Sequence, residues 1–263
     1  MSAQEFFTPV GFDFLWESAG AGEMPYPFTV RSHGETDQER GVLRQRVNAE
    51  FAARGLPNAE VETWLGVLAR PSVSIDALHI PQFQAPPVSV LAASDGDLAV
   101  LAVQDADGVW LRSIYPDGLA SAVVDLLPAC ARGTQVASTL PIDEALRTRP
   151  SRLGAHAGSG PEAGARESRR RTGLAERAQD PAESYAELIA QPRLRGGQLA
   201  ANSRDEVGVR RRSPVLAWFD TATGRYLSLS RQGPDGREWV TVAPADAKTL
   251  RGRLSELLAE VAH

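Results

Sequence analysis

The histidines are the first residues to examine for chemistry, because an imidazole can act as a base, an acid or a metal ligand near neutral pH. The chain has four, and they lie far apart in the sequence: His33, His79, His156 and His263. No HExxH motif, histidine–cysteine cluster or EF-hand loop accompanies them. A metal site is therefore not expected, and each histidine is interpreted as structural or solvated.

The other groups that could support catalysis are equally isolated. Cys130, the only cysteine, has no histidine near it in the sequence and is expected to be a small buried hydrophobe. Ser159 lies in a Gly- and Ala-rich segment that lacks the rigid turn a nucleophilic serine needs. Gly20 and Gly22 belong to no phosphate-binding motif. No cofactor is expected, and the sequence favours a binding protein over an enzyme.

Two alternatives remain open at this stage. The first is an enzyme that uses a serine, His33 or His79, and a turn aspartate in a cleft between two halves of the chain. The second is a nucleic-acid-binding regulator that uses the arginine runs 169–171 and 210–212. These runs lack interleaved aromatic residues, so a solvated linker and protection of a strand edge are the favoured interpretations.

Composition is that of an ordinary globular chain. The 263 residues are 43% hydrophobic and 23% charged, with a formal net charge of −5 that does not favour nucleic acid or anionic lipid. No apolar run approaches the ~20 residues that span a bilayer. The first residues lack the basic and apolar regions of a signal peptide. Together with the single cysteine, these features predict a cytoplasmic protein with no membrane partner.

The sequence contains an internal repeat. Residues 103–116, VQDADGVWLRSIYP, align without a gap with residues 231–244, RQGPDGREWVTVAP. Residues 62–71 and 183–192 align in the same way, and both have helical apolar spacing that ends at a proline. The repeated unit is therefore predicted to be a helix, four antiparallel strands and a closing helix.

The strands of the repeat are predicted from alternating apolar residues between turns. The expected strands are 72–80, 87–93, 97–104 and 108–115 in the first unit, and 196–203, 213–219, 224–231 and 236–243 in the second. Residues 245–261 are expected to form the last helix, with leucines on one stripe. Before the first unit we expect a helix around Phe12–Trp16, a short strand at 25–34 and a helix that opens with a capping box at Thr36–Glu39.

These elements predict an α+β fold with a central antiparallel sheet flanked by helical bundles, in which a duplicated unit has quasi-twofold symmetry. The expected halves are residues 1–130 and 131–263, joined in one globular domain. Residues 150–179 lack apolar periodicity and are expected to be a flexible insertion in the second half.

One sheet face of the first half is predicted to bind a partner. If residues 224–243 form a hairpin with a four-residue loop, Leu229 faces Val240 and a polar surface results in the second half. The equivalent positions of the first half are apolar, and exposed apolar sheet tends to be covered by another molecule. The predicted contact residues are Leu98, Val100, Leu111 and Tyr115. The alternative is that a helix of the same chain covers this face.

Three segments, in this order and spacing, resemble the EspG family, the cytosolic chaperones of type VII (ESX) secretion in actinobacteria. They are FDFLWESAGAGEMPYPFTVRSHGETDQERGVL at 12–43, LARP at 68–71, and FDTATGRYLSLSRQGPDGREWVTVAPADAKTLRGRLSELL at 219–258. The resemblance implies a quasi-twofold α+β chaperone, monomeric or weakly dimeric. Its implied partner is a PE–PPE-like helical heterodimer or a related secreted helical hairpin.

The resemblance also implies which segments contact that partner. In the family the substrate tip is held by the sheet, by a loop between early strands and by the C-terminal helical part. Mapped onto this sequence, these correspond to the loop 80–87 and the helix 245–261. The residues expected to contribute are Gln82, Phe83, Leu250, Leu254 and Leu257.

Overall fold

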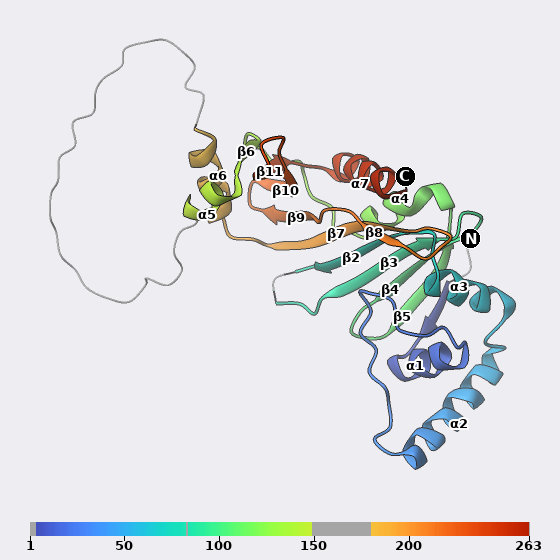
Figure 1. Cartoon of the computed structure of the whole chain (residues 1–263). Coiled ribbons are helices and arrows are strands. Elements are labelled where there is room, and N and C mark those ends of the chain that lie inside the picture. Colours follow the sequence, from blue (N-terminus) through green and yellow to red (C-terminus); the bar gives the residue numbers. More distant parts are fainter. Residues whose placement is uncertain (1–3, 83, 149–179, 263) are drawn as a thin grey trace, which may run out of the picture.

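The computed structural model describes residues 4–82, 84–148 and 180–262. The predicted insertion at 150–179 and Phe83 lie outside the described residues. Strands and helices occupy most of the remaining chain, in the arrangement shown in Figure 1.

The strands form an 11-stranded antiparallel sheet with the order β1-β5-β4-β3-β2-β7-β9-β10-β11-β6, and β8 pairs with β7. Reading outward from the central β2–β7 pair, the strands of each half follow in corresponding order, which gives the sheet its quasi-twofold symmetry. The predicted α+β fold is confirmed. The strands are β1 Gln4–Phe7, β2 Val73–Ile80, β3 Val88–Ser94, β4 Ala99–Gln104, β5 Val109–Ile114, β6 Ser138–Pro141, β7 Arg195–Arg204, β8 Arg210–Arg212, β9 Leu216–Thr221, β10 Gly224–Gln232 and β11 Glu238–Pro244.

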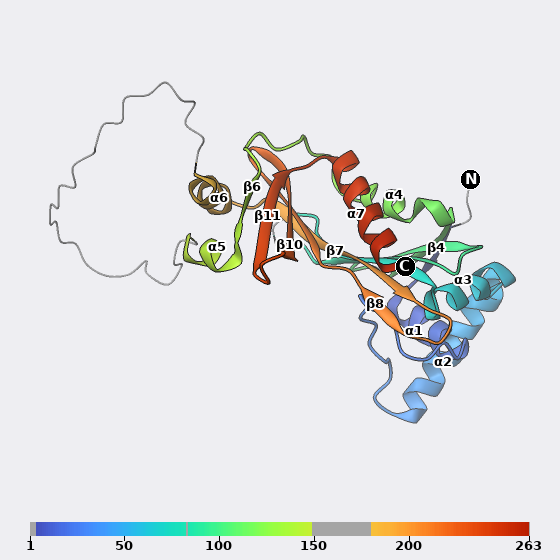
Figure 2. The same cartoon turned by 45° about the horizontal axis from the view of Figure 1, so that its top comes forward.

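The helices are distributed unequally over the two faces of the sheet. One face carries α4 and α7, while the other carries α1, α2 and α3 at one end and α5 and α6 at the other end (Figures 1 and 2). The helices are α1 Pro9–Ser18, α2 Asp37–Arg54, α3 Ala59–Ala69, α4 Leu119–Val124, α5 Ile142–Thr148, α6 Pro181–Ala190 and α7 Ala247–Ala262, with a 3-10 turn at Pro116–Gly118.

Three hydrophobic cores correspond to these three groups of helices. Under α4 and α7, the leucine stripe of α7 packs on strand residues such as Ile75 and Trp218. The aromatic core under α1–α3 contains Phe7, Phe12 and Trp64. The smaller core under α5 and α6 is centred on Tyr226. Each helix group thus covers only the part of the sheet on which it packs.

Helix boundaries follow the sequence signals closely. Thr8 caps α1 by accepting a hydrogen bond from the backbone N–H of Gly11 at 3.1 Å. Thr36 caps α2 in the same way, and its partner Glu39 accepts from the backbone N–H of Glu35 at 2.9 Å. The carboxylate of Glu39 therefore satisfies a donor one residue before the cap, a small variation on the predicted capping box.

The predicted strand at 25–34 is wrong, because this segment has no regular secondary structure. Pro25 and Pro27 lack the N–H groups that a sheet partner would need. The edge of β5 is already occupied by β1. The segment is instead tied to the sheet by the Gln104 side chain, which bonds both the N–H and the carbonyl of Thr29, at 3.0 and 3.1 Å.

The strand register predicted for the hairpin 224–243 is also wrong, by one residue. Leu229 faces Thr241, and Ser230 faces Val240. The loop is one residue longer than assumed: Gly236 adopts a left-handed φ of 74° and the N–H of Gly233 bonds to the carbonyl of Arg237 at 2.7 Å. Val240 and Val242 consequently pack under α5 and α6 instead of bordering a polar surface.

A buried ion pair at the β9–β10 turn fixes the connection between the two halves. The Nε of Arg225 donates to Asp220 at 2.7 Å, and both side chains are almost fully inaccessible. Arg225 also donates to the carbonyl of Pro128 at 2.7 Å. Arg195 donates to Asp220 at 2.7 Å and to the carbonyl of Ala129 at 3.3 Å. The chain that leaves α4 is thus held against the second half by charge-assisted bonds.

We expect Asp220→Ala to lower the free energy of unfolding by about 3–5 kcal/mol, because it leaves the buried guanidinium of Arg225 without its counter-ion. The matched control is Asp143→Ala, which removes exposed ion pairs to Arg147 and Arg237 and is expected to leave the free energy of unfolding nearly unchanged. Urea unfolding followed by circular dichroism measures both. Equal losses for the two variants would contradict the structural role of the buried pair.

Candidate functional site

The centre of the sheet carries apolar side chains that no described helix covers. Alternation along β2 directs Ile75 and Ala77 into the core under α4 and α7, and directs Asp76, Leu78 and Ile80 to the opposite face. Leu78 is 36% exposed and Ile80 is 45% exposed. Large apolar residues on the middle strand of a sheet are normally covered. Their exposure marks a candidate interaction surface.

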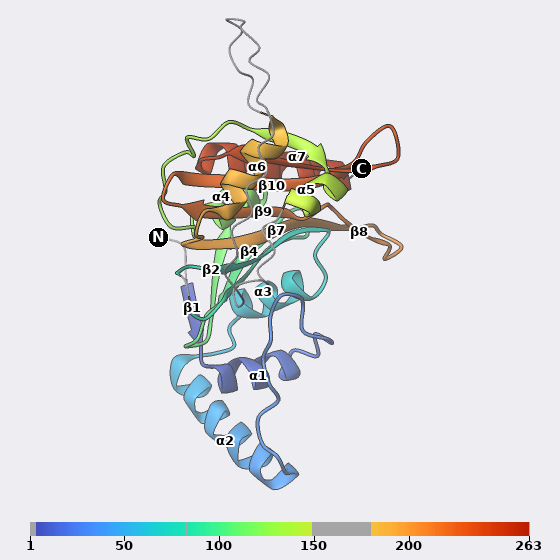
Figure 3. The ribbon, with the colours of Figure 1, turned by 90° about the vertical axis from the view of Figure 1, so that its left-hand side faces the viewer.

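We call this surface the central face and define it by Leu78, Ile80, Gln198 and Ala217. Gln198 on β7 pairs with Leu78 on one side and with Ala217 on β9 on the other, so the residues are adjacent across three strands. Figure 2 shows α1 and α2 on one side of this region and α5 on the other. Figure 3, viewed from the end that carries α5 and α6, shows the same separation. The central face is therefore the floor between two helix groups.

Close packing of β2 against β7 forms this floor. A Cβ atom at Gly197 would lie 2.6 Å from the Cβ of His79 and 2.7 Å from the carbonyl oxygen of Leu78. Only glycine allows the two backbones to approach so closely at this position. The two halves of the chain are thereby joined edge to edge where the exposed residues lie.

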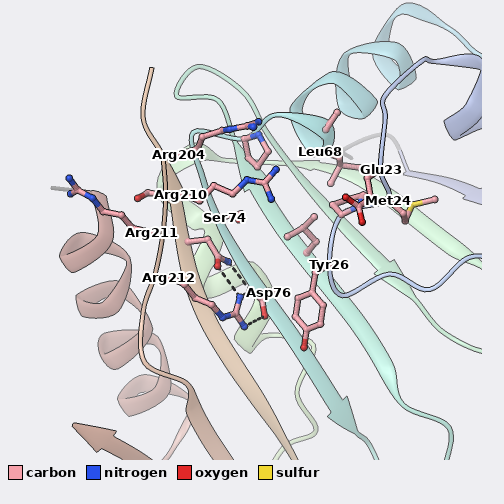
Figure 4. A pocket seen from close by; sticks show the side chains of 16 residues that line it. Glu23, Met24, Tyr26, Leu68, Ser74, Asp76, Arg204, Arg210, Arg211 and Arg212 are labelled. Carbon is pink, nitrogen blue, oxygen red and sulfur yellow. Dashed lines mark hydrogen bonds and ion pairs between the residues drawn. The ribbon is translucent and has the colours of Figure 1, made fainter. Parts of the chain in front are cut away.

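A groove of about 690 Å³ adjoins the central face (Figure 4). Its floor contains Asp76, whose carboxylate accepts from the Nη1 and Nη2 atoms of Arg212 at 2.5 and 3.0 Å. Asn202 donates to the same carboxylate at 2.7 Å. The hydrogen bond to Asp76 raises the pKa of Arg212, so this guanidinium and this carboxylate neutralise each other. The pair ties β8 to the floor of the groove.

The residues predicted to bind a partner are not brought together. Five of them are buried in the cores: Val100, Leu111, Leu250, Leu254 and Leu257. The expectation that they form an exposed surface is wrong, because α1–α3 cover the apolar face of the first half and α7 directs its leucines inward. The alternative in which helices of the same chain cover that face is the one observed.

The remaining predicted residues lie at opposite ends of the strands. Leu98 is 49% exposed and Tyr115 is 81% exposed, beyond the ends of β4 and β5. Gln82 is exposed in the loop between β2 and β3. The seven residues of β3 separate the two ends by roughly 20 Å at about 3.3 Å per residue. Gln82 borders the central face, whereas Leu98 and Tyr115 do not.

The groups that an enzyme would need do not converge. His33 lies on the loop before α2, with its Nδ1 3.3 Å from Asp13, and that carboxylate is also bound by Arg40 at 3.1 Å. Partial burial alone would raise the pKa of Asp13, but hydrogen bonds from Arg40 and from the backbone of His33 outweigh it and lower the pKa. Through these contacts Asp13 on α1 is linked to Arg40 on α2, which is a structural role.

His79 and Cys130 lie elsewhere and are poorly suited to catalysis. Burial lowers the pKa of His79, and the charge of Arg225 acts in the same direction, so the imidazole is neutral. Burial raises the pKa of the Cys130 thiol, and the carboxylate of Asp220 raises it further. Among the described residues, no group of three or more histidines, cysteines and acids could hold a metal ion.

The second arginine run forms strand β8, while the run 169–171 lies outside the described residues. Arg210, Arg211 and Arg212 are exposed, and β8 pairs only with the end of β7. This placement fits the predicted protection of a strand edge. Arg212 is engaged by Asp76 and is not free to contact phosphate.

Sequence reasoning missed Leu78 and the groove, and it included Ile80 only as the first residue of the loop 80–87. The strand VSIDALHI is apolar on both faces, so its pattern does not reveal which face a helix covers. The sequence did contain one signal for the groove. Asp76 interrupts a strand that otherwise has the pattern of a buried strand, and it faces away from the core under α4 and α7. Such a carboxylate requires a cationic partner, and Arg212 supplies it.

A model of the EspG family matches residues 8–256. The chain belongs to the EspG family. The fold is similar to that of the Mycobacterium tuberculosis type VII secretion system chaperone EspG5, solved in complex with the PE25–PPE41 dimer. The TM-score is 0.66 at 15% sequence identity, and the match covers 97% of this chain and 96% of EspG5. No curated protein matches the sequence. Within the described part of this EspG-family chain, every helix is too short or too polar to cross a membrane.

We expect Leu111→Asp to unfold this EspG-family protein, because it places a carboxylate in the aromatic core at the cost of several kcal/mol. Leu98→Asp is the matched control, since the same change at an exposed leucine is expected to shift stability by less than about 1 kcal/mol. Thermal melts followed by circular dichroism compare the two. A folded Leu111→Asp variant would place that side chain on the surface instead.

Proposed function

We propose that this protein is a cytoplasmic chaperone of a type VII secretion system that binds a PE–PPE-like helical heterodimer through the central face. Family membership supports the chaperone role, and the PE25–PPE41 dimer held by EspG5 indicates the class of partner. The observation that carries the proposal is the exposure of Leu78 and Ile80 on the innermost strand of the sheet. The two repeated halves act as one rigid binding platform and perform no catalysis.

The geometry of the central face suits the end of a helical pair. Its floor combines the apolar side chains of Leu78 and Ile80 with Gln198. It lies between α1–α3 and α5–α6, which limits how an elongated partner is oriented (Figure 2). The loop that contains Gln82 borders the floor at one end. Leu194 is also exposed where the chain enters β7, on the side of α6. A partner tip placed here would contact both halves of the duplicated unit.

Burial of the central face supplies part of the binding free energy. Completing the burial of Leu78 or Ile80 contributes about 1 kcal/mol each, since each is already more than half buried and a full aliphatic side chain contributes about 1.5–3 kcal/mol. The PE–PPE-like pair is the client of this chaperone. Binding covers the apolar tip of the client, and because bound and free client are in equilibrium, the aggregation-prone free client stays scarce. Neither ATP nor a metal ion is required for this mode of action.

The test is co-expression with a PE–PPE-like helical heterodimer from the same organism, read by size-exclusion chromatography and titration calorimetry. We expect a stable complex with the wild type, and at least tenfold weaker binding for Leu78→Asp, because a carboxylate is desolvated at the apolar contact. Leu98→Asp provides the matched control and is expected to bind normally, since Leu98 lies at the other end of the strands.

Two results would contradict the proposal in different ways. Separate elution of the wild-type protein and the pair, with no gain in the solubility of the pair, would exclude the chaperone function. Normal binding by Leu78→Asp together with weak binding by Leu98→Asp would place the binding site at the other end of the strands, near Leu98. Circular dichroism melts of both variants establish that each is folded.

A further inference from the structure

The groove beside the central face has one charged wall and one apolar wall. β8 and the end of β7 form the charged wall, while Met24, Pro25 and Leu68 contribute to the other (Figure 4). Asp76 lies on the floor between them (Figure 4), and Asn202 also lines the groove and donates to the carboxylate of Asp76. A ligand that fits both walls must combine negative charge with an apolar side chain.

Two guanidinium groups in the groove are not neutralised. Figure 4 shows Arg204 and Arg210 directed into the groove, whereas Arg211 points away from it. No ion pair is formed by Arg204 or Arg210 within the described part of the chain, and the Nε of Arg204 is buried there without a hydrogen-bond partner. An anionic ligand in the groove would supply the counter-charge that these two guanidinium groups lack within the described residues.

The opposite wall adds one unpaired acid. Glu23 lines the groove across from Arg210, and among the described residues it forms no ion pair (Figure 4). Arg212 and Asp76 cancel each other. Two positive charges therefore face one negative charge in a chain whose overall formal charge is −5. The groove is locally cationic on an acidic protein, which favours an anionic occupant.

The apolar wall decides between classes of anion. A free phosphate would leave Met24 and Leu68 without contacts. Single-stranded nucleic acid needs aromatic platforms on which bases stack. Tyr26 is the aromatic residue of the groove lining, and its ring already lies 5.5 Å from the guanidinium of Arg212. A peptide segment with a carboxylate and an aliphatic side chain fits both walls.

We propose that this groove binds an acidic segment of the same helical client that occupies the central face. The inference rests on the proposed function. Continuity of the two surfaces supports it: Asp76 on the groove floor and Leu78 on the central face are two residues apart on β2 and share one face of the sheet. Carboxylates of the client pair with Arg204 and Arg210, while an aliphatic side chain contacts the Met24 wall.

The experiment measures the dissociation constant of the client pair by titration calorimetry at low and high ionic strength. Arg210→Ser is expected to weaken binding about five- to tenfold at low salt, because one charge-assisted contact is lost. Arg211→Ser is the matched control, being the same change on the same strand with the side chain directed away, and is expected to change affinity less than twofold. The difference between the two should shrink as salt screens the interaction.

A third variant tests the sign of the ligand charge. Glu23→Gln removes the acid of the lining that forms no ion pair among the described residues, and it is expected to tighten binding about two- to threefold if the occupant is anionic. Weaker binding by Glu23→Gln would overturn the proposal, as would equal effects of Arg210→Ser and Arg211→Ser. Because all three positions lie in exposed or loop segments, melting curves are expected to match the wild type, and this is checked for each variant.

Failure of the inference and failure of the proposed function are distinguishable. If the client binds the wild type and Leu78→Asp weakens the complex while Arg210→Ser does not, the central face remains the site and the groove is excluded. If the client does not bind the wild type at all, both the chaperone function and the acidic segment are excluded.

Discussion

The antiparallel pairing of β2 with β7 is the constraint on which the rest of the molecule depends. It joins the innermost strands of two repeated units, from Val73 opposite Ser203 to Ile80 opposite Gly196, and so makes one sheet from two. Each unit carries its own helices, and on the face that carries Leu78 these helices pack toward the outer strands. The symmetry that builds the sheet therefore leaves its centre uncovered on one face, where Leu78 and Ile80 remain exposed.

Charged residues reinforce this junction between the two halves. Asp220 and Arg225 form a buried pair that holds the chain between the two halves, through the carbonyl of Pro128. Asp76 and Arg212 form a second pair that fixes β8 beside the groove. The arrangement suits a rigid platform for binding another protein.

Much of the fold was predictable because its signals are local. Alternating apolar residues between turns identified the eight strands of the repeat, and the capping box at Thr36–Glu39 identified the start of α2. The site was not predictable in the same way. Leu111 and Leu78 are both leucines on strands of the first half, yet one is enclosed by α1–α3 and the other is exposed. That difference depends on where helices that are distant in the sequence pack against the sheet.

By itself, the sequence determined that the chain is a duplicated α+β unit with an antiparallel sheet, that its histidines and cysteine are scattered, and that it resembles the EspG family. Tertiary structure alone decided that the helices α1–α3 and α7 bury the predicted contact leucines, and that β2 and β7 meet at the centre. The physical reason is that side-chain alternation specifies two faces for every strand but not which of them is covered. Coverage is settled by packing between segments far apart in the chain, and here it left Leu78, Ile80 and the arginine-lined groove accessible.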